Sequence, residues 1–243
     1  MKTQKPREIA FCILLKREQT QRFTENLLDR ELTRNPLPPA DRGLCQELVY
    51  GCIRWQAALD HLIDARTNGR RQPPGVRIAL RLGLYQLFRL DRVPQHAAVH
   101  ETVATAKALG FSRQSGFINA ILRHYTREHP ATRRHLEQLR KDEPALGYSH
   151  PEWLVEHWTA QFGGAKTRQL LEWNDQPAKT FARVNTLKTS AADLAKRWEN
   201  AESVTCEPLA RDWLGDIPFF ELHSHPPLST LPSFLEGWFY IQD

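Results

Sequence analysis

Two groups of imidazole and thiol side chains have the residue types of a transition-metal site. His96 and His100 are four residues apart at the start of a predicted helix, which places two imidazoles on one face. His223 and His225 lie in the loop-like segment HSHPP, and Cys206 precedes His223 by seventeen residues. Structural zinc is usually held by four well-placed ligands, and neither group supplies enough of them. We therefore expect helix entry and packing at the first group and no metal at either.

The four cysteines show the pattern of a reduced protein. None of Cys12, Cys45, Cys52 and Cys206 stands in a Cys-x-x-Cys pair. Cys45 and Cys52 are seven residues apart on one helical pattern, so about 10 Å separates them and no disulfide can join them. We expect free thiols and a cytoplasmic protein.

The apolar segments are too short for a membrane. None approaches the roughly 20 residues that a spanning helix needs. The N-terminal stretch MKTQKPREIAFCILLKREQ has charges on both sides of a short apolar run and no small-residue cleavage site. It predicts a helix of the folded domain, no signal peptide and no membrane partner.

The net charge of +5 is unevenly distributed. Residues 1–145 carry 25 lysines and arginines against 15 acidic residues, whereas residues 146–243 carry 8 against 13. All but five of the 25 cations are arginines, whose planar fork suits phosphate oxygens and base stacking. Solvated helix faces account for many of these charges but not for their single sign, so the first half predicts a nucleic-acid partner.

The candidate nucleic-acid contacts are basic residues of the helical half. Arg123 and Arg127 are four residues apart and share one helical stripe. Each cation taken singly is expected to be a solvated surface residue, but together they predict a basic strip that neutralises phosphates. The candidates are Arg7, Arg42, Arg54, Lys107, Arg113, Arg123, Arg127, Arg133 and Arg134.

Hydrophobic periodicity predicts an all-α bundle in the first half. Apolar residues recur at three- and four-residue steps through 41–65, and 77–90 is apolar on nearly all sides, as expected of a buried central helix. Gly51 would let a neighbouring helix approach closely. The expected helices are 7–18, 22–33, 41–65 (ending at Asn68-Gly69), 77–90, 97–109, 112–129 and a charged linker helix at 133–143.

The second half predicts a smaller α+β module. Helices are expected at 151–162, at 165–174 and at 190–200, the last with a Ser190 cap, and strands at 179–185, 217–222 and 238–241. The domain organisation that we predict is a helical domain at 1–130, a linker helix at 131–147 and the α+β domain at 148–243.

Four sequence strings resemble the NusB-like domain shared by NusB and the N-terminal part of the RsmB/Sun family. They are RGLCQELVYGCIRW (42–55), GLYQL (83–87), VPQHAAVHETV (93–103) and GFINAILRHY (116–125), in the family's order. The resemblance continues through GYSHPEWLVEHW (147–158) and RVNTLKTS (183–190) to GWFYIQD (237–243).

This resemblance implies a function as well as a fold. RsmB/Sun proteins are S-adenosylmethionine-dependent cytosine-C5 methyltransferases of small-subunit ribosomal RNA, and this chain resembles their RNA-recognition half. The family's small domain is similar to an RNA-recognition motif, in which Arg183 and Lys188 would contact RNA or, equally, stand at exposed strand ends. The tryptophans near residue 153 would serve interdomain packing.

The residues for methyl transfer itself are missing from the sequence. No glycine-rich turn follows a strand to hold S-adenosylmethionine, and no cysteine has the family's Thr-Cys-Ser or Pro-Cys-Ser context. We assign no catalytic, cofactor-binding or metal residue. In the parent protein we expect the cofactor-binding half to follow Gln242-Asp243, so that this chain alone binds RNA and is inactive.

Two alternatives remain open at this stage. One is a NusB-like antitermination factor without enzymatic activity, which would pair with a small ribosomal protein on RNA. The other is a truncated gene product without function. The residues after 145 that match the methyltransferase family favour the RNA-binding half of the enzyme.

Overall fold

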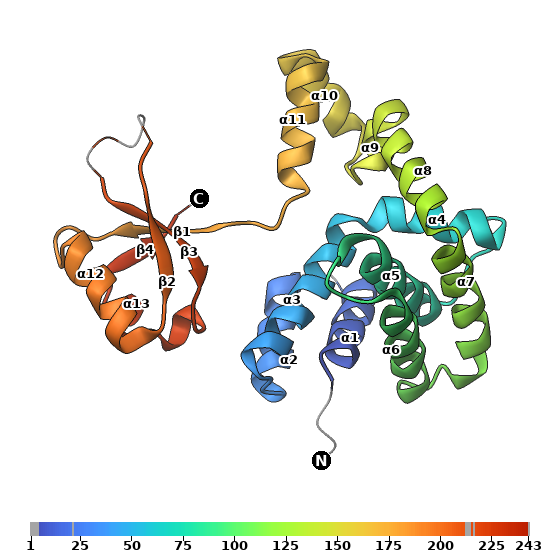
Figure 1. Ribbon diagram of the computed structural model, residues 1–243, viewed down its shortest axis with the longest axis horizontal. Helices are drawn as coiled ribbons and strands as arrows, with labels where there is room; N and C mark the ends of the chain where they lie inside the picture. Colours follow the sequence, from blue (N-terminus) through green and yellow to red (C-terminus); the bar gives the residue numbers. More distant parts are fainter. Residues whose placement is uncertain (1–4, 21, 212–214, 216, 243) are drawn as a thin grey trace. The chain divides into compact units, whose positions relative to one another are not determined.

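The chain divides into two compact units, Met1–Asp175 and Gln176–Asp243. The computed structural model describes residues 5–20, 22–211, 215 and 217–242. The first unit is helical and the second contains a four-stranded sheet (Figure 1). The predicted fold class, mainly α with a small α+β module, is confirmed. Among the described residues, no helix is both long and apolar enough to cross a bilayer.

The first unit is built from helices joined by short connections. Proline occupies the first turn of several helices, where its missing N–H costs nothing. The elements are α1 (Pro6–Gln19), α2 (Thr24–Arg34), α3 (Pro39–Arg54), α4 (Gln56–Thr67), α5 (Pro74–Arg89), α6 (Gln95–Ala108), the 3-10 turn η1 (Ser112–Gln114), α7 (Ser115–Arg127), α8 (His129–Asp142), α9 (Pro144–Gly147), α10 (Glu152–Phe162) and α11 (Gly164–Asn174).

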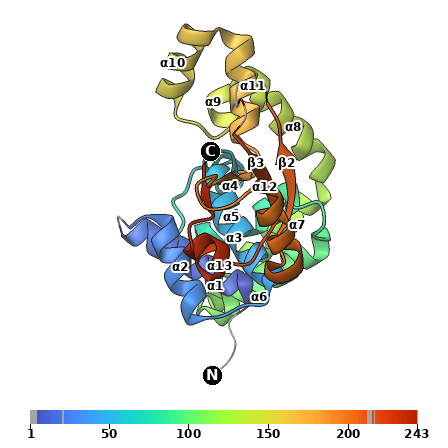
Figure 2. The ribbon, with the colours of Figure 1, turned by 90° about the vertical axis from the view of Figure 1, so that its left-hand side faces the viewer.

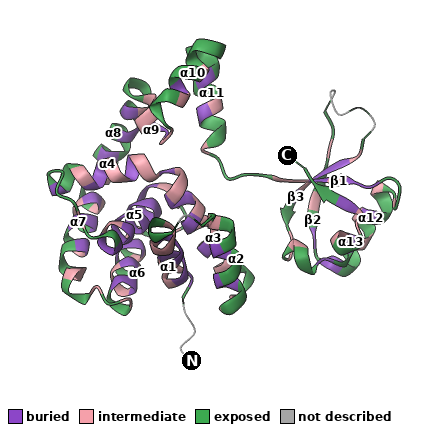
Figure 3. Ribbon diagram, turned by 180° about the vertical axis from the view of Figure 1, so that it is seen from behind, coloured by how far each residue is buried: buried purple, intermediate pink, exposed green. Residues whose placement is uncertain are grey.

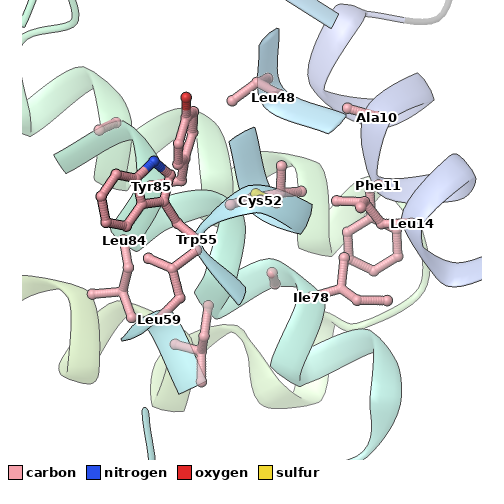
Figure 4. Packing of buried hydrophobic residues seen from close by; sticks show 14 of the residues in the cluster. Ala10, Phe11, Leu14, Leu48, Cys52, Trp55, Leu59, Ile78, Leu84 and Tyr85 are labelled. Carbon is pink, nitrogen blue, oxygen red and sulfur yellow. The ribbon is translucent and has the colours of Figure 1, made fainter. Parts of the chain in front are cut away.

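Helix α5 is the centre of the bundle, as its all-round apolar sequence predicts. Thirteen of its 16 residues are buried, and it packs against α1, α3, α4, α6 and α7. Figure 2 shows α1, α3 and α6 around it from a second direction, and buried turns gather on its neighbours (Figure 3). Side chains of α1, α3, α4 and α5 fill the space between them, among them Phe11, Leu48 and Ile78 (Figure 4).

The prediction of one long helix at 41–65 is wrong in one respect, because the chain forms two helices there. Helix α3 ends at Arg54, Trp55 adopts a non-helical conformation with φ −101° and ψ 16°, and α4 begins at Gln56. Both helices pack against α5, so their apolar residues continue at helical spacing across the bend. The periodicity therefore conceals the turn. The predicted end of this segment is confirmed, because Asn68 caps α4 in the left-handed conformation.

A glycine in α3 permits the close approach of α5. A Cβ atom added at Gly51 would stand 1.9 Å from Cζ of Tyr85, whose ring is buried. The Tyr85 hydroxyl donates a hydrogen bond to Glu47, which holds the ring against the glycine. The expectation that Gly51 admits a neighbouring helix is confirmed.

Helices α8 to α11 extend the first unit beyond the main bundle. Leu136 of α8 joins the main core, while Tyr148, Val155 and Leu171 form a small core between α9, α10 and α11. The segment predicted as a linker helix is thus packed on the bundle. The first compact unit continues to Asp175, well past the predicted start of the second domain at 148.

A cluster of cations lies around the bend at Trp55. The guanidinium of Arg89 lies 3.3 Å from the centre of the Trp55 ring, and that of Arg140 lies 4.9 Å from it. Asp175 lies near these cations, yet both its carboxylate oxygens are buried without a hydrogen-bond partner. Burial raises the pKa of Asp175 to about 7, although Arg140, Arg89 and Arg54 act to lower it.

The second unit has the strand order β2-β3-β1-β4, entirely antiparallel. Its elements are β1 (Thr180–Val184), α12 (Ala191–Arg197), the π-helical turn η2 (Trp198–Glu202), β2 (Thr205–Leu209), β3 (Phe219–Ser224), the 3-10 turn η4 (Leu228–Thr230), α13 (Pro232–Leu235) and β4 (Phe239–Ile241). This β-α-β-β-α-β order with β1 between β3 and β4 is the ferredoxin-like arrangement. The sequence predicted three strands and missed β2, whose mixed polar sequence TCEPL lacks an alternating pattern.

Trp198 is the centre of the core of the second unit. It is fully buried, contacts Phe220 and Phe239 edge to face, and donates its Nε1–H to Ser233 at 3.1 Å. The predicted Ser190 cap is confirmed, because its Oγ accepts from the backbone N–H of Asp193 at 3.1 Å.

We predict that Gly51→Ala lowers the free energy of unfolding by about 1–3 kcal/mol, because the new methyl group overlaps the fixed Tyr85 ring. Urea denaturation of the purified chain measures this. Gly43→Ala in the same helix is the control, since nothing lies within 4 Å of its Cβ position. It should gain up to about 1 kcal/mol from helix propensity. Equal effects of the two changes would contradict the close-approach account.

A second prediction concerns Asp175 and pH. In the unfolded chain its carboxyl group has an ordinary pKa of about 3.9, whereas burial raises the folded pKa to about 7. The folded protein therefore holds a proton that the unfolded chain releases, so the free energy of unfolding falls as pH rises from about 4 to about 7. Asp175→Asn removes this contribution. The stability of wild type relative to the variant should thus decline across that window in urea titrations.

Asp91→Asn is the control for this measurement, because the Asp91 side chain is 85% exposed. A difference between wild type and Asp175→Asn that stays constant from pH 4 to pH 7.5 would show that Asp175 does not retain a proton in the folded state.

Candidate nucleic-acid interface

Some arginines of the first unit are neutralised inside the bundle. Arg81 of α5 is 9% exposed and donates from Nε and Nη2 to the two oxygens of Asp60, at 2.7 and 2.8 Å, and from Nη1 to Glu18. Arg77 donates to Asp60 at 3.0 Å and to both oxygens of Asp64. The charges of these two arginines are therefore balanced by carboxylates of the fold.

Arg7, a predicted contact residue, is also engaged within the fold. Its Nε donates to Oε1 of Gln86 at 2.7 Å, and burial lowers its pKa. Gln86 is itself buried and donates to the Thr102 hydroxyl at 3.2 Å. Arg7 therefore links α1 to α5 and α6, and its part in binding is restricted to its remaining donors.

Helix α7 presents a stripe of exposed positions without a carboxylate. Its buried face consists of Ile118, Ile121, Leu122 and Tyr125. Gly116, Ala120, Arg123 and Arg127 are exposed at steps of four, three and four residues, so they form one stripe. Arg113 is exposed in the preceding turn η1. We call Arg113, Arg123 and Arg127, together with the small residues between them, the α7 stripe.

Only one bond inside the chain restrains a cation of the α7 stripe among the described residues. Arg123 donates its Nε–H to Oδ1 of Asn119 at 3.2 Å, one turn earlier in the same helix. Small side chains at 116 and 120 leave room for a phosphate backbone to approach the helix. The stripe thus combines access with donors of one sign.

Arg66 borders this surface, although the sequence analysis did not select it. Its guanidinium lies 5.7 Å from the ring centre of Tyr125 in α7, and Arg66 is itself exposed. The contact joins α4 to α7 across 59 residues, so no local pattern could have indicated it. The sequence did place a basic residue near the end of a predicted helix at this position, but many other arginines share that feature.

The other predicted contacts of the first unit are dispersed. Arg133 pairs with Asp91 at 3.0 Å and stays half-exposed, whereas Arg134 is exposed on α8. Lys107 is exposed near the end of α6. Arg42 and Arg54, in α3, are half-buried.

The two candidates in the second unit make hydrogen bonds to residues near its C-terminal strand. Lys188 donates to the carbonyl oxygen of Glu236 at 2.6 Å, and Arg183 of β1 donates to Gln242 at 3.5 Å. Asn185 lies between them and donates to the Gly237 carbonyl at 2.8 Å. The RVNTLKTS segment therefore ties β1 to the turn before β4.

The histidine groups do not converge on a metal. His96 and His100 are exposed, and His100 contacts Glu101 at 3.2 Å. Cys206 of β2 packs against the sheet core, while His223 is exposed near Glu207 at 3.5 Å. Within the residues that the structure describes, no three His, Cys, Asp or Glu side chains could hold a metal ion together.

Two parts of the chain match known protein families. Residues 4–127 match the NusB family, and residues 150–211 match the family described as "Methyltr_RsmF/B-like, ferredoxin-like domain". A solved structure titled "Crystal Structure of PH0851" is similar over 98% of this chain and 54% of its own, with a TM-score of 0.66 and 17% identity, which shows the fold alone.

Two curated relatives have the same name. The "Probable ribosomal RNA small subunit methyltransferase B" of Synechocystis sp. is 38% identical over 98% of this chain and 52% of its own length. The Bacillus subtilis protein of the same name is 36% identical over 80% of this chain and 43% of its own. The chain thus spans about half the length of the curated relatives that it matches.

The ferredoxin-like match begins at residue 150, whereas the first compact unit ends at Asp175. The boundaries 1–130, 131–147 and 148–243 therefore stay a prediction. The two family matches occur in one chain and in the order expected from its sequence. On this basis the chain belongs to the NusB family, and over residues 150–211 it also carries a match to the ferredoxin-like domain of RsmF/B-like methyltransferases.

Proposed function

We propose that this chain is the RNA-docking part of an S-adenosylmethionine-dependent cytosine-C5 methyltransferase of small-subunit ribosomal RNA. The single observation that carries the proposal is the α7 stripe, a row of exposed arginines on a helix without a carboxylate. The names of the curated relatives give the reaction class and the RNA.

Cations that the fold does not already pair with carboxylates are the ones best able to bind RNA phosphates. Arg77 and Arg81 are paired with carboxylates of the fold, so their positive charge is already balanced. The arginines of the α7 stripe lie outside this network. Each phosphate that they neutralise releases condensed counterions, which makes the binding favourable and strongly dependent on salt.

Phosphate contacts of this kind position RNA and do not read its sequence. Arg66 beside Tyr125 extends the same surface from α4. Arg183 and Lys188 of the second unit keep donors beyond their local bonds and serve as secondary contacts. The first unit then holds the RNA, and the target cytosine is presented to a methyl-transfer site outside the described residues.

The thiols of this chain are poorly suited to the covalent step. Cytosine-C5 methylation uses a cysteine thiolate as nucleophile. Burial raises the pKa of Cys45 to about 12 and also raises the pKa of Cys12, Cys52 and Cys206. A thiol with a raised pKa carries little thiolate at neutral pH. We therefore assign RNA binding, and no chemistry, to these residues.

A stand-alone NusB-like antitermination factor is the weaker alternative. It would account for residues 4–127 and leave the ferredoxin-like match at 150–211 without a role.

We predict that Arg123→Ala/Arg127→Ala weakens binding to a small-subunit ribosomal RNA hairpin. The slope of log K against log salt concentration should flatten by about one to two units, because two phosphate contacts are lost. Fluorescence anisotropy with a labelled hairpin at several salt concentrations measures both effects.

The matched control is Arg30→Ala/Arg34→Ala, which also removes two exposed arginines four residues apart, on α2. Helix α2 carries carboxylates at Glu25, Asp29 and Glu31, so its cations are locally balanced. Equal slopes for the two double variants would place RNA recognition elsewhere than on the α7 stripe.

We also predict that the purified chain transfers no methyl group from S-adenosylmethionine to this RNA, since none of its thiols is activated. Incorporation of a radiolabelled methyl group into the hairpin is the measurement. Labelling above the level of a no-protein blank, lost in Cys206→Ser, would overturn the assignment, because Cys206 is among the less buried thiols.

A further inference from the structure

A cavity of about 810 Å³ opens in the first unit between α4, α9 and α10. Its size is typical of pockets that bind ligands, which enclose about 300–1,000 Å³. Apolar side chains form its inner wall, including Leu146 of α9 and Val155 of α10. We call it the α9–α10 pocket.

The rim of the α9–α10 pocket is acidic. Asp142 and Glu143 lie at the end of α8, and Glu152 and Glu156 lie on α10; all four are exposed. Among the residues that the structure describes, no lysine or arginine lines the pocket. The surrounding unit has the opposite balance, since residues 1–175 carry 27 lysines and arginines against 19 acidic residues. The pocket is therefore a local reversal of the unit's charge.

The wall next to the rim is held in a fixed conformation. Nδ1 of His150 lies 2.6 Å from the carbonyl oxygen of Tyr148. Because a carbonyl oxygen only accepts hydrogen bonds, Nδ1 is the donor and carries the proton. The His150 ring also contacts Trp158, with ring centres 5.9 Å apart. Side chains that are already fixed lose little entropy when a ligand binds.

The charge pattern decides what kind of ligand fits. Carboxylates around the mouth repel a phosphate backbone, so RNA is disfavoured here. The apolar inner wall gives no stabilisation to a small hydrated cation, but it would bury an apolar side chain. A peptide that carries both apolar and cationic side chains satisfies both parts of the pocket.

We propose that the α9–α10 pocket docks a lysine- or arginine-rich amphipathic segment of a partner protein. An apolar side chain of the segment enters the cavity, and its cations pair with Glu152 and Glu156, which are one helical turn apart. The proposal does not rest on the proposed function. It adds a protein-binding surface whose charge is opposite to that of the α7 stripe.

The experiment uses a fluorescein-labelled peptide of lysine and leucine placed at helical spacing, and the full chain. We expect saturable binding of this peptide by anisotropy and no binding of a peptide with glutamate in place of each lysine. Spermidine at the same concentration as the peptide should not displace the peptide from the pocket. Displacement by spermidine would overturn the proposal, because it would reduce the pocket to a site for simple cations.

Pocket variants localise the binding. Glu152→Gln/Glu156→Gln should weaken it about tenfold, since two exposed charge pairs are lost. Ala160→Arg adds bulk and a cation to an exposed position of the wall and should abolish it. The matched control is Glu25→Gln/Asp29→Asn, two exposed carboxylates four residues apart on α2.

The far-UV circular dichroism spectrum and the thermal unfolding midpoint of each variant should match those of the wild type, which verifies folding. Peptide affinity that is unaffected by Ala160→Arg, or that falls equally in the α2 control, would overturn the proposal.

Discussion

The helical unit depends on neutralising two arginines that its central helix carries into the bundle. Helix α5 is buried on nearly every side, so Arg77 and Arg81 must find partners within the protein. Asp60 and Asp64 of α4 and Glu18 of α1 supply them. Removing one partner of such a pair leaves an uncompensated charge in a medium that solvates it poorly, which costs several kcal/mol. The network therefore fixes α1 and α4 on α5, whereas apolar packing alone would tolerate other arrangements of the same helices.

This internal pairing determines where the unit's positive charge can act. Cations on α5 and at Arg7 are used by the fold, and those of α7 remain at the surface because the other face of that helix is apolar. The same helix thus contributes to the core through Ile118 and Leu122 and to the basic surface through Arg123 and Arg127.

Charge is segregated within the first unit as well as between halves of the chain. The α7 stripe is cationic, and the rim of the α9–α10 pocket is anionic. Surfaces of opposite sign on one compact unit can bind partners of opposite sign without competition, and each repels the partner of the other. The chain divides after Asp175, whose buried carboxylate lies among the arginines around Trp55.

The sequence by itself determined the helical half, the α+β half, the buried central helix and the role of Gly51, because each follows from local periodicity, breakers or residue size. It also determined the family, through strings in a fixed order. It did not reveal the bend at Trp55, since both helices pack on α5 and keep one periodicity. It missed β2, Arg66 beside Tyr125 and the acidic pocket, and it could not separate Arg7 from the exposed arginines. Those features depend on contacts between residues far apart in the chain, and only the tertiary structure decides which charges are paired and which remain free.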